Sequence, residues 1–494
     1  MQYVSTRNNH PPVNASRAIA LGMVPEGGLF VPETVPDLGF LPTGSESYGS
    51  VAERILPPLL TDFPAPEVAS CIARAYNAAS FDTDEIVNVV PLDEGRSVME
   101  LWHGPTAAFK DVALQIMPHL LGTAKKIIGD RSHTVILVAT SGDTGKAALE
   151  GFRNCDGIAI IVFYPHGGVS EVQKLQMTTT DGTNTRVIGV KGNFDECQTE
   201  VKRLLGSSSL RERYREKGFE FSSANSINWG RLCPQIAYYF SSYGKLVGRG
   251  TIAAGDKVNF CIPTGNFGNI LAGYYAMRMG LPIDKLICAS NANKVLADFF
   301  AAGLYDSNRP FSRTVSPSMD ILISSNLERF LYEVTGHDAG AAAGWSRSLA
   351  GTGAFRVDEP TREAMGRFIV PGWVDEQEVL ATIGATFRQT GYVLDTHTAV
   401  AAALGRRVAL PDGRHTIIAS TASPFKFGTA VLKGMTGEVV DDEFRAIDRI
   451  STLSGMPVHR ALLQLRQRQE RHTRVIEKNM MQDTLVELMQ DIAG

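Results

Sequence analysis

A lysine that follows a short apolar segment is the side chain of this sequence best suited to covalent chemistry. Lys110 lies in HGPTAAFKD, residues 103–111, after a Gly-Pro turn and the apolar triplet at 107–109. Burial would disfavour the charged form of this lysine and lower its pKa, so that the amine could act as a base or form an imine with a carbonyl cofactor. Because most lysines are solvated surface charges, the spacing alone leaves a non-catalytic role open.

Three further segments place glycines and short polar side chains where a predicted strand gives way to a helix. They are TSGDTG at 140–145, PTGNFGN at 263–269 and ASTASP at 419–424. Glycines let backbone amides approach a ligand, and the first turn of a helix attracts anions. The second segment suits a phosphate monoester or is an ordinary turn, and the hydroxyls of the third could face a heteroaromatic nitrogen or cap a helix.

Two other kinds of site are not supported by the sequence. Lys146 invites comparison with a P-loop, but GxxxxGK[ST] would need glycine at 140 and a hydroxyl residue at 147, where the chain has Thr140 and Ala147. The six cysteines are spread singly and form no CxxC pair. We therefore expect neither a Walker-type nucleotide site nor a metal site.

Apolar strands that alternate with amphipathic helices must position these loops. Strands are predicted at 134–140, 157–164, 185–190, 219–222, 258–262, 285–290 and 416–420. Helices are predicted at 145–153, 170–178, 197–205 and 269–279 and from 428 onward. This alternation predicts parallel sheets covered by helices on both faces, with ligands at the C-terminal ends of the strands.

The length of 494 residues indicates more than one compact core. We expect an α/β protein with two doubly wound parallel-sheet domains and an N-terminal subdomain of helical and mixed structure. The expected boundaries are 1–98 for the N-terminal subdomain, 99–250 for the domain with Lys110 and 251–494 for the domain with PTGNFGN.

Composition narrows the class of partner. The net charge of −4 provides no overall field for nucleic acid or anionic lipid, and we interpret the basic run at 466–474 as a solvated helix face. No apolar stretch reaches the ~18 residues of a membrane span, and the first residues do not resemble a signal peptide. With scattered cysteines typical of a reducing compartment, we expect a cytoplasmic protein that binds neither nucleic acid nor membrane.

In their order along the chain, these segments resemble the threonine synthase family, pyridoxal-phosphate enzymes of fold type II with a tryptophan synthase β-subunit-like fold. The segments that carry the resemblance are YVSTRN, GGLFVPE, HGPTAAFKD, TSGDTGKAA, NSINWGR, PTGNFGN and DTHTAVA. HGPTxAFKD is highly specific for that family. The other segments are moderately specific, and together the matches extend over most of the chain.

The resemblance implies pyridoxal 5′-phosphate as the cofactor, held by Lys110 as an imine. It places the hydroxyl of Thr421 opposite the pyridine nitrogen and Asp143 near the cofactor O3′. The residues implied to cradle the cofactor phosphate are Gly265, Asn266, Phe267, Gly268 and Asn269.

For the reaction, the resemblance implies that O-phospho-L-homoserine and water give L-threonine and phosphate. The loop with Ser141, Gly142 and Thr144 would receive the substrate carboxylate. The residues implied to bind the substrate phosphate are Asn225, Ser226 and Arg231, and the planar guanidinium of arginine bonds phosphate oxygens in pairs. The protein would act as a monomer or homodimer.

Two positions depart from the family pattern. Asp143 stands where many relatives of this fold have asparagine, and TASPFKF has no histidine near Ser423, which leaves roles around Ser423 and Lys426 open. His103 and His397 could each line the site, or could be satisfied within a turn and at a helix cap.

Two other functions also stay open. A related enzyme could carry out elimination alone and release phosphate with 2-oxobutanoate, and a non-catalytic protein could keep the fold and the cofactor. The intact Lys110 argues against the non-catalytic protein, and the NSINWGR segment favours a phosphorylated substrate.

Overall fold

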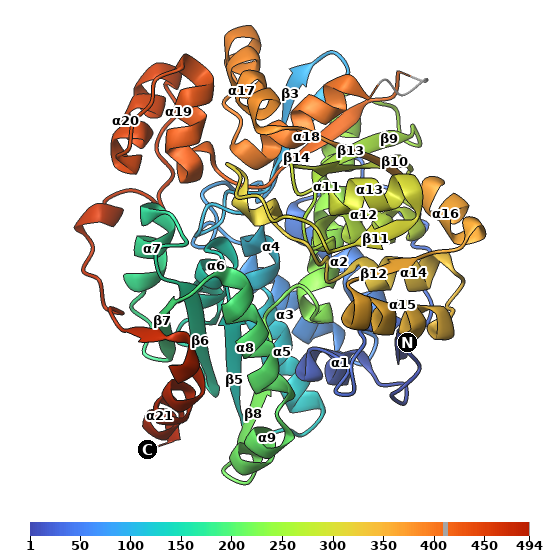
Figure 1. Ribbon diagram of the computed structural model, residues 1–494. Coiled ribbons are helices and arrows are strands. Elements are labelled where there is room, and N and C mark those ends of the chain that lie inside the picture. The colour runs from blue at the N-terminus through green and yellow to red at the C-terminus, as the bar shows by residue number, and fades with distance from the viewer. Residues whose placement is uncertain (409–412, 494) are drawn as a thin grey trace.

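The computed structural model describes residues 1–408 and 413–493, and it is an α/β structure built on two mainly parallel sheets (Figure 1). This confirms the predicted fold class, because buried strands that alternate with helices along a chain form parallel sheets covered on both faces. Among the described residues, no helix combines the length and the apolar character needed to cross a membrane.

The first sheet has five parallel strands, and the TSGDTG loop follows β5. In spatial order they are β15 (Val475–Glu477), β7 (Thr185–Lys191), β6 (Ile158–Pro165), β5 (His133–Ala139) and β8 (Phe219–Ser222). The helices that contact these strands or share a core with them are α5 (Met117–Ile127), α6 (Asp143–Phe152), α7 (Glu171–Thr178), α8 (Phe194–Gly206), α9 (Ser208–Arg215) and α21 (Met481–Ala493). Alternate strand residues face opposite sides: Ile136 shares a core with α5 and α6, and Leu137 shares one with α8 and α21.

The second sheet has six strands, of which only the edge strand β3 is antiparallel to its neighbour. In spatial order they are β13 (Ile369–Trp373), β10 (Ile283–Ser290), β9 (Val258–Pro263), β14 (Thr416–Ser420), β4 (Arg96–Glu100) and β3 (Asn88–Asp93). One core is shared with α11 (Ile236–Gly248), α12 (Gly268–Arg278) and α13 (Val295–Ala302). The other is shared with α17 (Glu376–Thr390), α18 (Thr396–Arg407), α19 (Gly428–Thr436) and α20 (Glu443–Ser454).

Smaller elements join the two sheets. The N-terminal region has the antiparallel pair β1 (Tyr3–Ser5) and β2 (Phe30–Pro32) with α1 (Ala15–Leu21), α2 (Tyr48–Ile55) and α3 (Ala65–Ala75). Because α1 and α3 pack on α5 while α2 packs on α11, this region contacts both halves. The remaining elements are α4 (Lys110–Leu114), α10 (Trp229–Leu232), β11 (Leu304–Asp306), α14 (Leu327–Val334), α15 (Ala339–Thr352), β12 (Ala354–Arg356) and α16 (Glu359–Gly366).

Segments from both ends of the chain complete the sheets. β4 pairs with β14 and brings β3 with it, and β15 pairs with β7 beside the red C-terminal helix α21 (Figure 1). The division into 1–98, 99–250 and 251–494 stays a prediction about folding units, and the sheets draw strands from across these boundaries.

The basic run at 466–474 does not form the predicted helix face. Apart from a short 3-10 turn at Leu465–Gln467, it is irregular up to β15. The backbone amides of Arg471 and His472 donate to the carbonyl of Thr178 at the end of α7. These bonds hold the backbone against α7, where it cannot make the bonds of a helix of its own.

A buried arginine fastens the NSINWGR segment to the rest of the fold. Arg329, in α14, is 0% exposed. Its guanidinium donates to Phe30 O at 2.9 Å, Asn326 Oδ1 at 2.7 Å and Ile227 O at 2.6 Å. Three segments that are far apart in the sequence therefore meet at one side chain.

Arg329→Met should lower the free energy of unfolding by about 3 kcal/mol, because it leaves buried acceptors without a donor. Urea unfolding followed by circular dichroism measures this. Arg347→Met, on the exposed side of α15, is the matched control and should stay within about 0.5 kcal/mol of the wild type. Equal losses in the two variants would contradict the assigned role of Arg329.

Candidate active site

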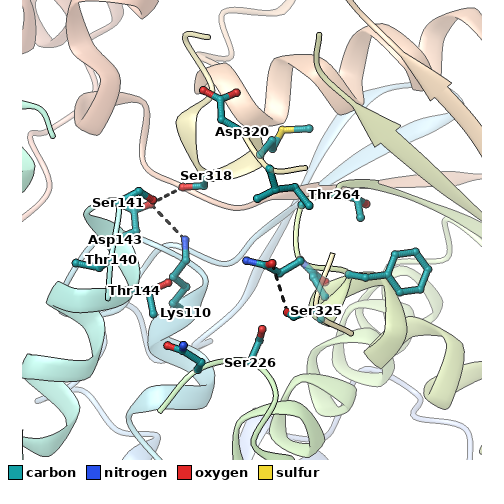
Figure 2. Close-up of a pocket in the computed structure, with 18 of the residues that line it drawn as sticks. Lys110, Thr140, Ser141, Asp143, Thr144, Ser226, Thr264, Ser318, Asp320 and Ser325 are labelled. Atoms are coloured by element: carbon teal, nitrogen blue, oxygen red, sulfur yellow. Dashed lines mark hydrogen bonds and ion pairs between the residues drawn. The ribbon is translucent and has the colours of Figure 1, made fainter. Parts of the chain in front are cut away.

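The site residues predicted from the sequence lie around one pocket at the C-terminal ends of the strands. It is lined by Thr140 after β5, Pro263 at the end of β9 and Thr421 after β14. Figure 2 shows Lys110 and Asp143 on one side of this pocket and Thr264 on the other. Loops at the same end of parallel strands converge, and ligands of open α/β folds bind there.

All but one of the fourteen predicted site residues line the pocket. The thirteen are Lys110, Ser141, Asp143, Thr144, Asn225, Ser226, Arg231, Gly265, Asn266, Phe267, Gly268, Asn269 and Thr421. Gly142 is buried and does not line the pocket, and a Cβ there would lie 2.5 Å from Cδ of Gln173. Its φ of +129° gives a second reason for glycine at this turn.

Backbone hydrogen bonds hold the lysine loop beside the loop after β14. Phe109 N donates to Thr421 O at 2.9 Å, and Ser423 N donates to Ala107 O at 3.1 Å. Lys110 is the first residue of α4, so these hydrogen bonds fix the backbone from which its side chain extends. This pairing explains why residues about 310 positions apart in the sequence line the same pocket.

The amine of Lys110 is buried next to one carboxylate. Lys110 is 8% exposed. Its Nζ lies 3.4 Å from Asp143 Oδ2 and 4.9 Å from the Phe109 ring centre. Burial lowers the pKa of the Lys110 ammonium, and the positive charges of Lys426 and Arg231 act in the same direction while Asp143 opposes them. Lys110 can therefore give up a proton more readily than an ordinary lysine.

Asp143, the first residue of α6, is an anion held by several donors. Gln173 Nε2 donates to its Oδ1 at 2.9 Å, and Ser318 Oγ donates to its Oδ2 at 3.3 Å. Burial raises the pKa of this carboxyl, but the ammonium groups of Lys426 and Lys110 outweigh burial and hold the pKa below its usual range. Asp143 therefore stays ionised in the pocket.

The PTGNFGN loop presents a free donor at the start of a helix. Phe267, in a left-handed conformation with φ of +63°, leads into α12. Tyr238 and Tyr239 both donate to Asn269 Oδ1, at 2.7 and 2.8 Å, which orients the amide. Asn269 Nδ2 is buried and has no acceptor among the described residues. A buried donor without a partner at a helix N-terminus suits an anion.

Arg231 provides a second place for an anion. It is 4% exposed, its Nη1 donates to Ala224 O at 2.6 Å, and its Nε has no acceptor within the described part of the chain. No described carboxylate lies within ion-pair distance of its guanidinium. Burial lowers the pKa of Arg231 to about 10, with the charge of Asp111 opposing the change, so the side chain keeps its charge at neutral pH.

Several residues of the site gave no signal in the sequence. Ser318 and Met319 come from a short turn at Pro317–Met319 that lines the pocket, and Gln173 reaches Asp143 from α7. His397, for which two roles were open, lines the pocket and accepts a hydrogen bond from Ser318 N at 3.1 Å, whereas the residue that caps α18 is Asp395.

His103 faces away from this pocket. It lines a separate cavity, where Nδ1 lies 2.7 Å from Asp82 Oδ1 and Nε2 lies 2.9 Å from Glu100 Oε2. Burial alone would lower the pKa of His103, but these two carboxylates raise it to about 9. The geometry therefore supports a structural role for His103, with its ring nitrogens satisfied by neighbouring side chains, over a place in the active site.

Comparisons with known proteins agree with this geometry. Residues 2–76 match the family model "Threonine synthase N terminus", and residues 98–421 match the model "Pyridoxal-phosphate dependent enzyme". The chain is 39% identical to threonine synthase-like 1 of Homo sapiens over 92% of its own length, and it spans 63% of that relative.

Two threonine synthases match over nearly their whole length. That of Pseudomonas aeruginosa is 36% identical, with 89% of this chain and 91% of the relative covered. The crystal structure of pyridoxal-phosphate-bound threonine synthase from Brucella melitensis superposes with a TM-score of 0.86 at 35% identity, covering 100% of this chain and 98% of that one. The chain therefore belongs to the threonine synthase family of pyridoxal-phosphate dependent enzymes.

Proposed function

We propose that the protein, with pyridoxal phosphate, converts O-phospho-L-homoserine and water into L-threonine and phosphate. One observation carries the proposal: a single pocket is lined by the buried amine of Lys110 and by two buried donors that lack an acceptor among the described residues, Asn269 Nδ2 and Arg231 Nε. The loop at 265–269 serves the cofactor phosphate, and the region of Arg231 serves the substrate phosphate.

The residues of the pocket fit the cofactor. The acceptor-less Nδ2 of Asn269 and the start of α12 suit its phosphate, and Lys110 provides the amine for its aldehyde. A Cβ at position 265 would lie 2.8 Å from Ser318 O, so only glycine lets the two loops approach this closely. Thr421 lies next to the lysine loop, and its hydroxyl would meet the pyridine nitrogen.

The remaining residues suit the substrate. Ser226 accepts a hydrogen bond from Asn326 Nδ2 at 3.0 Å, which holds it beside Asn225 and Arg231 at the pocket wall. Ser141, just before α6, and Thr144, in its first turn, would hold the substrate carboxylate. Donors for a carboxylate and donors for a phosphate in the same pocket would favour a substrate that carries both groups.

In the reaction, pyridoxal phosphate withdraws electrons from an amino-acid carbon skeleton when it is bound. The chain's own task is to place a base beside that skeleton. Lys110 Nζ, with its lowered pKa, can accept a proton and return it, and Asp143 Oδ2 at 3.4 Å stabilises the amine in its protonated form. Phe109, Phe267 and Met319 contribute apolar surface that keeps bulk water from the amine.

We also propose a cytoplasmic location, on the basis of the six free thiols, and a monomeric or homodimeric state. Metal chemistry is not part of the proposal: the described residues contain no group of His, Cys, Asp and Glu placed to hold an ion.

Product analysis tests the proposed reaction. Purified protein with pyridoxal phosphate and O-phospho-L-homoserine should release threonine and phosphate in equal amounts. Phosphate with 2-oxobutanoate would instead identify a phospho-lyase. If protein that binds the cofactor formed neither product, the proposed substrate would be wrong and a non-catalytic role would gain support.

Arg231→Met should raise KM for O-phospho-L-homoserine about 10- to 100-fold, because a charge-assisted hydrogen bond to phosphate contributes roughly 1.5–3 kcal/mol. Affinity for pyridoxal phosphate should change little, since its phosphate would lie at 265–269. Steady-state kinetics and a cofactor titration measure the two effects, with the exposed Arg213→Met as the matched control. An unchanged KM would refute the assigned role of Arg231.

A further inference from the structure

A second lysine, Lys426, is fully buried behind the pocket. It lies in the 3-10 turn Pro424–Phe427 that follows the Thr421 loop, and its side chain is 0% exposed. Its Nζ lies 2.7 Å from Asp143 Oδ1 and donates to Thr106 O at 3.1 Å. An ammonium group out of water is costly unless it is paired, so this position is a specific contact.

The two oxygens of Asp143 serve different partners. Oδ1 receives the ammonium of Lys426 and the amide of Gln173, both on the side away from the pocket. Oδ2 is left facing Lys110 Nζ at 3.4 Å and Ser318 Oγ at 3.3 Å, and Figure 2 shows Asp143 joined to both. The contact with Lys426 therefore fixes the orientation of the Asp143 carboxylate, which leaves its second oxygen for the reactive amine.

We propose that Lys426 is a positioning residue that holds Asp143 as an anion with Oδ2 directed at Lys110, and so sets the charge that the Lys110 nitrogen experiences. The proposal deepens the proposed function and rests on it in one respect, that Lys110 carries the cofactor. Lys426 does not line the pocket; its effect reaches the reacting atoms through Asp143 and through its own field.

The charges around Lys110 determine the direction of the effect. They are Asp143 on α6, Lys426 on the 3-10 turn, Arg231 on α10 and Asp111 on α4, with His397 on α18 also lining the pocket. Without Lys426, only Arg231 of these cations would still oppose Asp143, so the carboxylate would act more strongly on Lys110. A nearby carboxylate favours the protonated form of an amine, so the nitrogen would lose its proton at higher pH.

The test uses the protein loaded with pyridoxal phosphate and without substrate. Lys426→Met should raise the midpoint pH of the cofactor absorbance titration by about one unit or more, the size expected for a charge within ~4–6 Å. Lys433→Met, on the exposed side of α19, is the matched control and should titrate with the wild type. A Lys426→Met protein that also titrates with the wild type would overturn the proposal.

A second measurement asks whether Lys426 and Asp143 act as a pair, and it needs no cofactor. In urea unfolding, Lys426→Met and Asp143→Asn should each lower the midpoint, because each removes one partner of a buried ion pair. The double variant removes both charges and should lose clearly less than the sum of the two losses. Additive losses would contradict the pair.

These measurements separate the two proposals. If Lys426→Met shows the predicted shift of the titration midpoint but the wild-type protein forms no threonine, the role of Lys426 is retained and the substrate assignment is refuted. If Lys426→Met alone does not fold, recovery of folding and cofactor uptake in Asp143→Asn/Lys426→Met supports the pair, and failure of the double variant where Asp143→Asn folds contradicts it.

Discussion

A buried guanidinium without a carboxylate partner is the constraint on which the pocket depends. Burying a positive charge costs free energy that hydrogen bonds to carbonyls offset only in part, so Arg231 is stable where an anion can reach it. Contacts outside the pocket hold Arg231 in place. Arg329 on α14 donates hydrogen bonds to Ile227 O and to a carbonyl of β2. Asn228 caps α10, which carries Arg231. A place for an anion is thereby built into the packing of distant segments.

The same reasoning applies to the amine at the centre. Lys110 has a lowered pKa because it is buried among other cations, and Asp143 limits the effect without cancelling it. A pyridoxal phosphate and a phosphorylated amino acid would each bring negative charge to a pocket lined by buried cations. The same buried charges, on the loops at the strand ends, would therefore both attract these ligands and set the basicity of Lys110.

The sequence predicted the parts of the site that are local. Buried strands read as apolar runs, and the loops at 140–145 and 263–269 stand out because short polar residues interrupt those runs. Ser318 and Gln173 could not be found in this way, since each reaches the site from a different part of the chain through tertiary packing. The prediction of a helix face at 466–474 was wrong for a related reason: the backbone of this run donates hydrogen bonds to Thr178 O, a tertiary contact that no local pattern reveals.

A crystal structure of the protein with pyridoxal phosphate and a phosphonate analogue of O-phospho-L-homoserine would test the central claim most directly. The account predicts the cofactor phosphate against residues 265–269 and the phosphonate against the guanidinium of Arg231. A phosphonate bound elsewhere, with Arg231 still lacking an anion, would contradict it.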